Sequence, residues 1–174
     1  KGKDRRGQIP DMLSIHVRPP EIEDRQFPGH WEGDLIKGEG NASAVGTLVE
    51  RTSRLVMLVK LPQFKPASAA NVLQAFTDKL LGIAQPMRLS MTYDQGKEML
   101  MHKKLSEQTG IAVYFCDPHS PWQRGSNENM NGLVRQYLPK GTDLSIYSQE
   151  QLDAIADEIN NRPRKGLGVR SPLS

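Results

Sequence analysis

Three strand-like runs follow one another early in the chain, and every later segment alternates between helical and strand-like patterns. Residues 30–37, 44–50 and 54–61 either alternate in polarity or are rich in β-branched and apolar residues, and the polar link 51–53 predicts a hairpin. Three strands joined by such short links form an antiparallel meander. Any further strand must then return to the same sheet through helices, which restricts the chain to a mixed α/β architecture.

Helical periodicity recurs through the rest of the chain, with short apolar runs between the helices. Helices are predicted at residues 67–83, 97–109, 127–138 and 149–161, and strands at 88–93 and 111–115. Gly110 suits the left-handed position after a helix, and Ser148 with Gln151 forms a capping box. The order predicts one mixed five-stranded sheet, three antiparallel strands followed by two parallel ones, with helices on both faces.

The two ends of the chain depart from this pattern. Residues 1–28 contain four prolines and no sustained period, so we expect an extended N-terminal arm, a folded core over 29–165 and a C-terminal tail over 166–174. Both ends are basic and the net charge is +3, which suits a polyanionic partner, with solvated tails as the alternative. The chain begins with Lys1 rather than Met, which indicates a fragment of a longer protein.

Cysteine usage and hydropathy restrict the compartment. Cys116 is the single cysteine, so no intrachain disulfide forms and a reducing compartment is expected. No stretch approaches the roughly 20 apolar residues of a membrane span. We therefore expect a cytoplasmic protein with no membrane partner.

Three carboxylates occupy marked positions in the predicted elements. Asp34 interrupts the strand 30–37, where an unpaired charge is costly, and Asp94 follows a predicted strand at the start of a loop. Glu128 lies on the polar face of the predicted helix 127–138 together with Arg135. Converging carboxylates are the ligands that Mg²⁺ prefers, and two such ions about 3.5–4 Å apart catalyse phosphodiester chemistry.

Each of these residues also has a simpler interpretation. Asp94 suits an Asx-turn or a helix N-cap, and Glu128 with Arg135 suits a solvated ion pair rather than a carboxylate beside a phosphate-binding cation. Glu32 shares a face with Asp34, either as an accessory carboxylate or as an exposed strand residue. Trp31 points away from Asp34 and is predicted to lie in the core.

Long segments around these carboxylates resemble a known enzyme family. Residues 29–36 (GHWEGDLI), 120–133 (SPWQRGSNENMNGL) and 161–165 (NRPRK) are similar to segments of bacterial insertion-sequence transposases of the thirty-numbered family. These belong to the Asp-Asp-Glu transposase and retroviral integrase superfamily, whose cores have a ribonuclease H-like fold. The resemblance implies a polynucleotidyl transferase and DNA endonuclease with Asp34, Asp94 and Glu128 as the catalytic, metal-binding triad.

The resemblance also implies cofactors and partners. We expect two Mg²⁺ ions, replaceable by Mn²⁺, DNA as substrate and target, a homo-oligomer assembled on DNA, and action at the bacterial nucleoid. The helix-turn-helix modules that usually precede such a core are not visible, so an isolated catalytic core is expected. Six residues near the glutamate are expected to contact DNA: Arg124, Arg135, Trp122, Asn127, Asn131 and Lys140.

Alternatives remain for these residues and for the function. Trp122 stacks on a base or packs under its loop, and Asn127 and Asn131 contact DNA, order the active-site helix or cap it. The runner-up functions are a ribonuclease H-type nuclease acting on RNA–DNA hybrids and a non-catalytic DNA-binding or assembly module. Three carboxylates facing polyanionic DNA argue against the binding module.

Overall fold

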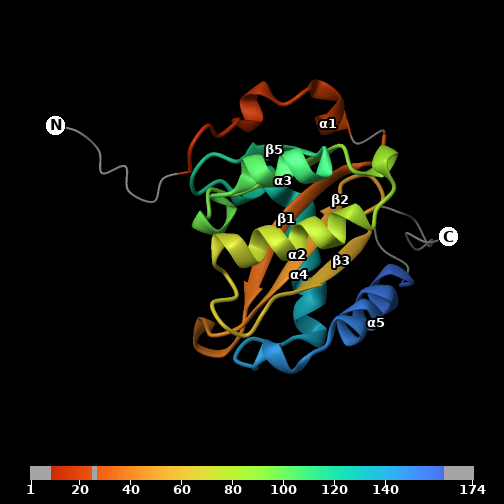
Figure 1. The fold of residues 1–174 in the computed structure, drawn as a ribbon. Helices are drawn as coiled ribbons and strands as arrows, with labels where there is room; N and C mark the ends of the chain where they lie inside the picture. Colours follow the sequence, from red (N-terminus) through yellow and green to blue (C-terminus); the bar gives the residue numbers. More distant parts are fainter. Residues whose placement is uncertain (1–8, 25–26, 163–174) are drawn as a thin grey trace.

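The computed structural model describes residues 9–24 and 27–162, which form one five-stranded sheet between two layers of helices (Figure 1). The strands are β1 (His30–Lys37), β2 (Ala44–Glu50), β3 (Val56–Lys60), β4 (Ser90–Tyr93) and β5 (Ala112–Phe115). They lie in the order β3-β2-β1-β4-β5. Pairing is antiparallel between β1, β2 and β3 and parallel between β1, β4 and β5. The predicted fold class, an α/β ribonuclease H-like mixed sheet, is confirmed.

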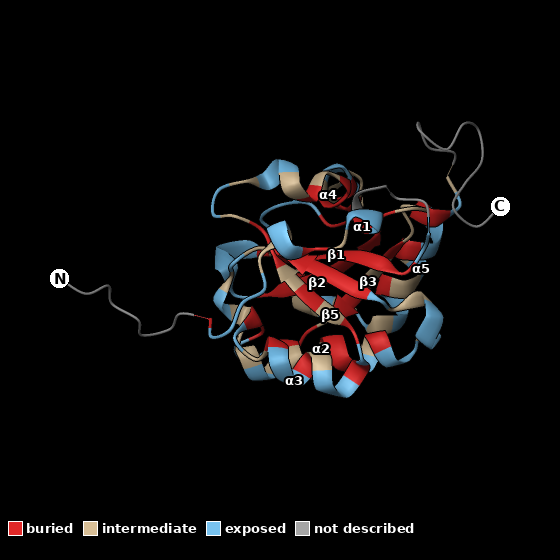
Figure 2. Cartoon of the chain, turned by 90° about the horizontal axis from the view of Figure 1, so that it is seen from above, coloured by how far each residue is buried: buried red, intermediate tan, exposed pale blue. Residues whose placement is uncertain are grey.

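The helices cover both faces of the sheet, as Figure 2 shows from above. They are α1 (Pro20–Asp24), α2 (Ala69–Leu81), α3 (His102–Thr109), α4 (Gly125–Tyr137) and α5 (Gln149–Asn160). Helices α2 and α3 pack on one face, and α4 and α5 pack on the other. The predicted capping box between Ser148 and Gln151 starts α5, and Gly110 ends α3 with a φ of 77°.

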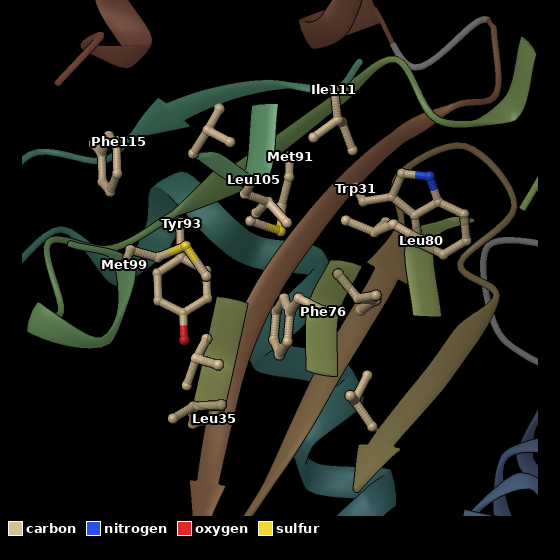
Figure 3. Packing of buried hydrophobic residues seen from close by; sticks show 14 of the residues in the cluster. Trp31, Leu35, Phe76, Leu80, Met91, Tyr93, Met99, Leu105, Ile111 and Phe115 are labelled. Atoms are coloured by element: carbon tan, nitrogen blue, oxygen red, sulfur yellow. The ribbon is translucent and has the colours of Figure 1, made fainter. Parts of the chain in front are cut away.

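Two separate apolar clusters follow from the alternation of side chains along the strands. On the α2 side, Phe76 and Leu80 meet Trp31 and Met91 (Figure 3). Trp31 is buried in this cluster, as predicted, and its indole Nε1 donates to the carbonyl of Met87. The opposite cluster joins α4 and α5 to strands β1, β2 and β3 through residues that include Ile36, Leu58, Val134 and Ile159. Odd and even positions of β1 therefore serve different faces.

Some element boundaries differ from those predicted. The third strand starts at Val56 rather than 54, because Arg54 takes a positive φ of 62° in the turn. The predicted helix over 97–109 divides into a 3-10 turn at Lys97–Met99 and helix α3. Helix α4 starts at Gly125 rather than 127, directly after a 3-10 turn at Pro121–Arg124. This earlier start brings Arg124 to the helix N-terminus.

The described part of the N-terminal segment is not a uniformly extended arm. It contains a 3-10 turn at Ile15–Val17 and helix α1, and Ile9 is buried in the core cluster on the α2 side. Leu13 accepts a backbone hydrogen bond from Phe115 at 2.7 Å, and Ser14 forms a parallel bridge to the same strand residue. The segment thus runs along β5, at the edge of the sheet (Figure 1).

Several predicted features lie outside the described residues. These are the basic residues Lys1, Lys3, Arg5 and Arg6, the C-terminal basic residues Arg164, Lys165 and Arg170, and the tail 166–174. Within the residues that the structure describes, no helix has both the length and the apolar character needed to span a bilayer.

Candidate active site

Backbone pairing places the two aspartates side by side. Strands β1 and β4 pair in parallel, with Glu32 opposite Thr92, so continuing the register by two residues sets Asp34 opposite Asp94. Both side chains emerge on the sheet face that α4 covers, because Ile36, two residues after Asp34, belongs to the α4 cluster. The spacing of sixty residues between the aspartates equals the offset of this register.

A buried arginine lies between the two aspartates. Nη1 of Arg124 is 3.5 Å from Oδ2 of Asp34, and Nη2 is 3.6 Å from Oδ2 of Asp94. Nη1 also donates to the carbonyl of Gly33 at 3.0 Å, which anchors the guanidinium to strand β1. Burial by itself lowers the pKa of Arg124, but the carboxylates of Asp34 and Asp94 outweigh it and raise this pKa. The arginine therefore stays charged between them.

Hydrogen bonds orient the side chains of the two aspartates. Oδ1 of Asp34 accepts from its neighbour Leu35 N at 2.8 Å, and Oδ2 accepts from Nδ2 of Asn131 at 3.1 Å. Burial raises the pKa of Asp34, although the positive charge of Arg124 and these hydrogen bonds lower it. Oδ1 of Asp94 accepts from Gly96 N at 2.9 Å, which is the Asx-turn foreseen as the simpler interpretation. Its Oδ2 still faces Arg124.

Helix α4 is fixed over the sheet by a buried carboxylate. Glu32 is fully buried in an ion pair with Arg51, so the alternative that it is an exposed strand residue is wrong. Its Oε1 accepts from the backbone N of Asn127 at 2.7 Å, which satisfies an amide in the first turn of α4. Glu32 therefore positions the residue directly before Glu128. Sequence reasoning did not single out Arg51, which lies in the hairpin turn without a distinguishing pattern.

Glu128 is exposed on α4 and is not gathered with the aspartates into a compact cluster. Across residues 9–24 and 27–162, no three His, Cys, Asp or Glu side chains lie together as a metal-binding group. Glu128 is nevertheless close along the helix to the Asp34 partner Asn131, which follows it by three residues on the same side of a 3.6-residue turn. Helix geometry thus presents Glu128 toward the edge of the Asp34 site.

The donor chemistry of this site fits a divalent metal ion. Asp34 and Asp94 offer carboxylate oxygens that already share one cation, the Arg124 guanidinium. Asp34 is mostly buried, and burial disfavours its charged form unless a cation is near. Oδ1 of Asn131 is a buried acceptor without a hydrogen-bond partner among the described residues. Carboxylate and amide oxygens are the ligands of hard cations such as Mg²⁺.

The residues predicted to contact DNA are not all at the surface. Asn127 is fully buried: its backbone N donates to Glu32 and its side-chain amide donates to Thr47, which agrees with the alternative that it orders the helix, and its contact with DNA stays a prediction. Arg135 is half-buried and donates to the carbonyls of Lys37 and Leu138. Asn131 faces Asp34, as described above.

Two of the predicted residues are exposed, which agrees with contact to a large partner. The side chain of Trp122 is 73% exposed, so the alternative that it packs under its own loop is wrong. Lys140 is also exposed, just beyond the C-terminal end of α4. Their contact with DNA remains a prediction.

A cavity of about 400 Å³ opens beside the arginine. Asp94 and Arg124 line it together with residues 95–96 and the loop 116–121. The cavity therefore adjoins the carboxylate pair rather than a separate part of the molecule.

Comparison with known proteins identifies relatives of this chain. The integrase core domain family matches residues 24–121. The transposase for insertion sequence element IS1086 of Cupriavidus metallidurans is 68% identical over 99% of this chain, and the chain spans 50% of that protein. Transposase InsI for insertion sequence element IS30A of Escherichia coli is 49% identical over 91% of this chain, which spans 40% of it.

Solved structures share the fold at low sequence identity. The catalytic core domain of BIV integrase superimposes with a TM-score of 0.57 at 20% identity, covering 83% of this chain and 91% of its own. A chain of the simian T-cell lymphotropic virus intasome in complex with PP2A regulatory subunit B56 gamma gives a TM-score of 0.64 at 14% identity, covering 97% of this chain and 60% of its own. The resemblance to insertion-sequence transposases is confirmed, and the chain belongs to the integrase core domain family.

Proposed function

We propose that this chain is the catalytic core of a transposase, a polynucleotidyl transferase and DNA endonuclease. In this proposal it cuts a DNA strand at the end of a mobile element and joins the freed 3′-hydroxyl to target DNA. The transposases named above support it, although the chain spans only about half of their length. The observation that carries it is the pairing of Asp34 with Asp94 around a shared cation, with Glu128 on the covering helix.

In this proposal Asp34, Asp94 and Glu128 hold divalent metal, namely Mg²⁺ with Mn²⁺ as a substitute and two ions in the active complex. Such ions supply an activated oxygen nucleophile and neutralise the charge that develops on the leaving oxygen. The protein supplies the orientation of the ligands. Asn131 and Leu35 fix the Asp34 carboxylate, and Gly96 fixes that of Asp94, so the oxygen atoms that face the site need little rearrangement.

DNA is the proposed partner. Trp122 and Lys140 are exposed beyond the N-terminal and the C-terminal end of α4, respectively. An aromatic ring can stack on a base there, and an ammonium group can contact a phosphate. We also propose that copies of the protein assemble on DNA, since the two ends of one element must both be cut and joined. Such an enzyme acts on the bacterial chromosome, in the cytoplasm at the nucleoid.

Replacement of Asp34 by asparagine tests the proposal. We expect Asp34→Asn to lose more than about a hundredfold of Mg²⁺-dependent nicking of supercoiled plasmid, because an amide is a far weaker metal ligand than a carboxylate. Asp78→Asn is the matched control, because it makes the same change at an exposed position of α2, on the opposite face of the sheet. Retained nicking by a folded Asp34→Asn protein would remove the assignment.

The choice of substrate separates the remaining candidates. Cleavage of an RNA–DNA hybrid in preference to duplex DNA would identify a ribonuclease H-type nuclease instead. DNA binding without any nicking or metal binding would identify a non-catalytic module.

A further inference from the structure

The guanidinium of Arg124 is held where it neutralises both aspartates at once. Only 7% of its side chain is exposed, and its two terminal nitrogens face one carboxylate each, at 3.5 and 3.6 Å. Nη1 also donates to the Gly33 carbonyl and to Oδ1 of Asn127, the latter at 3.4 Å, and these two bonds hold the guanidinium in place between the carboxylates. Asp34 and Asp94 thus share a cation that belongs to the protein itself.

The backbone that carries this arginine is also fixed. Arg124 ends a 3-10 turn and directly precedes α4, whose first turn is held by the buried carboxylate of Glu32. Its side chain lines the cavity of about 400 Å³ together with Asp94 and the loop 116–121. This cavity gives the guanidinium a space into which it can move away from the carboxylates while helix α4 stays in place.

We propose that Arg124 is a resident counter-cation of the metal site, which keeps Asp34 and Asp94 facing one another and lowers their affinity for a divalent ion. This inference rests on the proposed function, since it takes these aspartates as metal ligands. A singly charged guanidinium within about 4 Å of both ligands repels a doubly charged ion that binds to them. Metal binding then requires the guanidinium to move toward the cavity.

A purely structural role for Arg124 gives a different expectation. If the side chain served only to hold Gly33 and Asn127, its removal would loosen the site and weaken metal binding. The counter-cation role predicts tighter metal binding instead, because removal of the positive charge leaves two carboxylates that only the metal can neutralise. The direction of the change in metal affinity therefore distinguishes the two roles.

The test measures Mn²⁺ affinity of the 174-residue chain by electron paramagnetic resonance, without DNA and without turnover. We expect Arg124→Gln, which keeps a polar side chain but loses the charge, to bind Mn²⁺ about tenfold more tightly than the unaltered protein. Arg124→Lys keeps the charge and should stay within about twofold.

Arg88→Gln is the matched control for overall charge. It removes the same charge at a position two residues before strand β4, whereas Asp94 directly follows that strand. Arg88 therefore lies about 20 Å along the strand from Asp94, and its hydrogen bonds go to backbone carbonyls. That separation exceeds the Debye length of about 10 Å at 0.1 M salt, so its effect on Mn²⁺ affinity should be small.

Each outcome decides one point. Equal or weaker Mn²⁺ binding by Arg124→Gln overturns the counter-cation role while leaving the metal site intact. Absence of Mn²⁺ binding in every variant and in the unaltered chain overturns the proposed metal site itself. If Arg124→Gln does not fold, the unaltered protein still tests the inference by NMR. Mg²⁺ titration should shift the Nε–H resonance of Arg124 and not that of Arg88, and an unmoved Arg124 resonance refutes it.

Discussion

Glu32 lies on strand β1 with its side chain buried beneath helix α4, and its replacement by alanine tests how this helix is positioned. The change removes the carboxylate that pairs with Arg51 and leaves the backbone N of Asn127 without its acceptor. Breaking a buried ion pair from one side costs about 3–5 kcal/mol of unfolding free energy, since the remaining charge stays desolvated. For a domain of this size that equals a decrease in Tm of about 6–20 °C.

The assay is urea denaturation followed by circular dichroism, with Asp153→Asn as the comparison. Asp153 pairs with Lys79 at 2.9 Å, but both side chains are partly exposed, so this pair contributes at most about 1 kcal/mol. Glu32→Ala should also weaken Mn²⁺ binding, because Glu128 follows the released Asn127, whereas Asp153→Asn should not. A loss of stability no larger than that of Asp153→Asn would refute the reasoning.

Replacing both Glu32 and Arg51 distinguishes the effect of their charges from the effect of their packing. When both Glu32 and Arg51 become methionine, most of the lost stability should return, because two apolar side chains leave no buried charge behind. The metal affinity should stay low, since methionine cannot accept the hydrogen bond from Asn127. Recovery of both properties would mean that packing alone positions α4.

Three further predictions concern the core around the site. Burial raises the pKa of the Cys116 thiol to about 11, so at pH 8 the native protein should react with iodoacetamide at least about a hundredfold more slowly than the unfolded chain; equal rates would contradict this. Burial lowers the pKa of His30, so the unfolded state takes up the proton first as pH falls below about 6.5 and stability decreases. In melts between pH 7.5 and 5.5, His30→Asn should lose less stability than the unaltered protein, and parallel curves would refute the assignment. A β-carbon on Gly46 would lie 2.5 Å from Cε1 of Phe76, so Gly46→Ala should cost about 1–3 kcal/mol in urea denaturation, while Gly132→Ala, with open space around it, should not destabilise.

The order of the strands along the chain and the importance of the two aspartates, Asp34 and Asp94, could be predicted from the sequence. Asp34 was recognisable because a charge interrupts an otherwise buried strand, and Asp94 because it follows one. Their distance along the chain had no evident meaning until the structure related it to the parallel register of β1 and β4. The register was not predictable because it depends on which strands become neighbours, and the two strands and the helix between β1 and β4 leave that open.

The first residue of α4 was harder to predict. Gly125 and Ser126 have low helix propensity and predicted a loop, yet both lie in the helix. Contacts with β1, about ninety residues earlier in the chain, override that preference. Glu32 accepts from the first turn, and Gly33 accepts from Arg124. The burial of Glu32 was not evident either, because strand alternation with its polar neighbour Asp34 suggested a solvated face.

The path of the N-terminal segment also depends on contacts that leave no periodic pattern. Its attachment to the sheet uses the backbone of Leu13 and Ser14, which pairs with β5, together with a hydrogen bond from Arg18 to Thr92 of β4 at 2.8 Å. Backbone pairing at a sheet edge is nearly independent of side-chain type, so proline content alone indicated an extended arm.

Two kinds of interaction thus assemble the candidate site, and they respond differently to change. Backbone hydrogen bonds between β1 and β4 set Asp34 against Asp94, and single side-chain substitutions leave this ladder in place. Glu128 depends instead on the side chains that hold α4 against the sheet, namely Glu32, Asn127 and Asn131. Because Arg124 joins the two parts, bonding to β1 from the helix N-terminus, its charge influences the carboxylates while its backbone follows the helix. Substitutions of these side chains should therefore change the position of Glu128 relative to the two aspartates more readily than they change the position of the aspartates relative to each other.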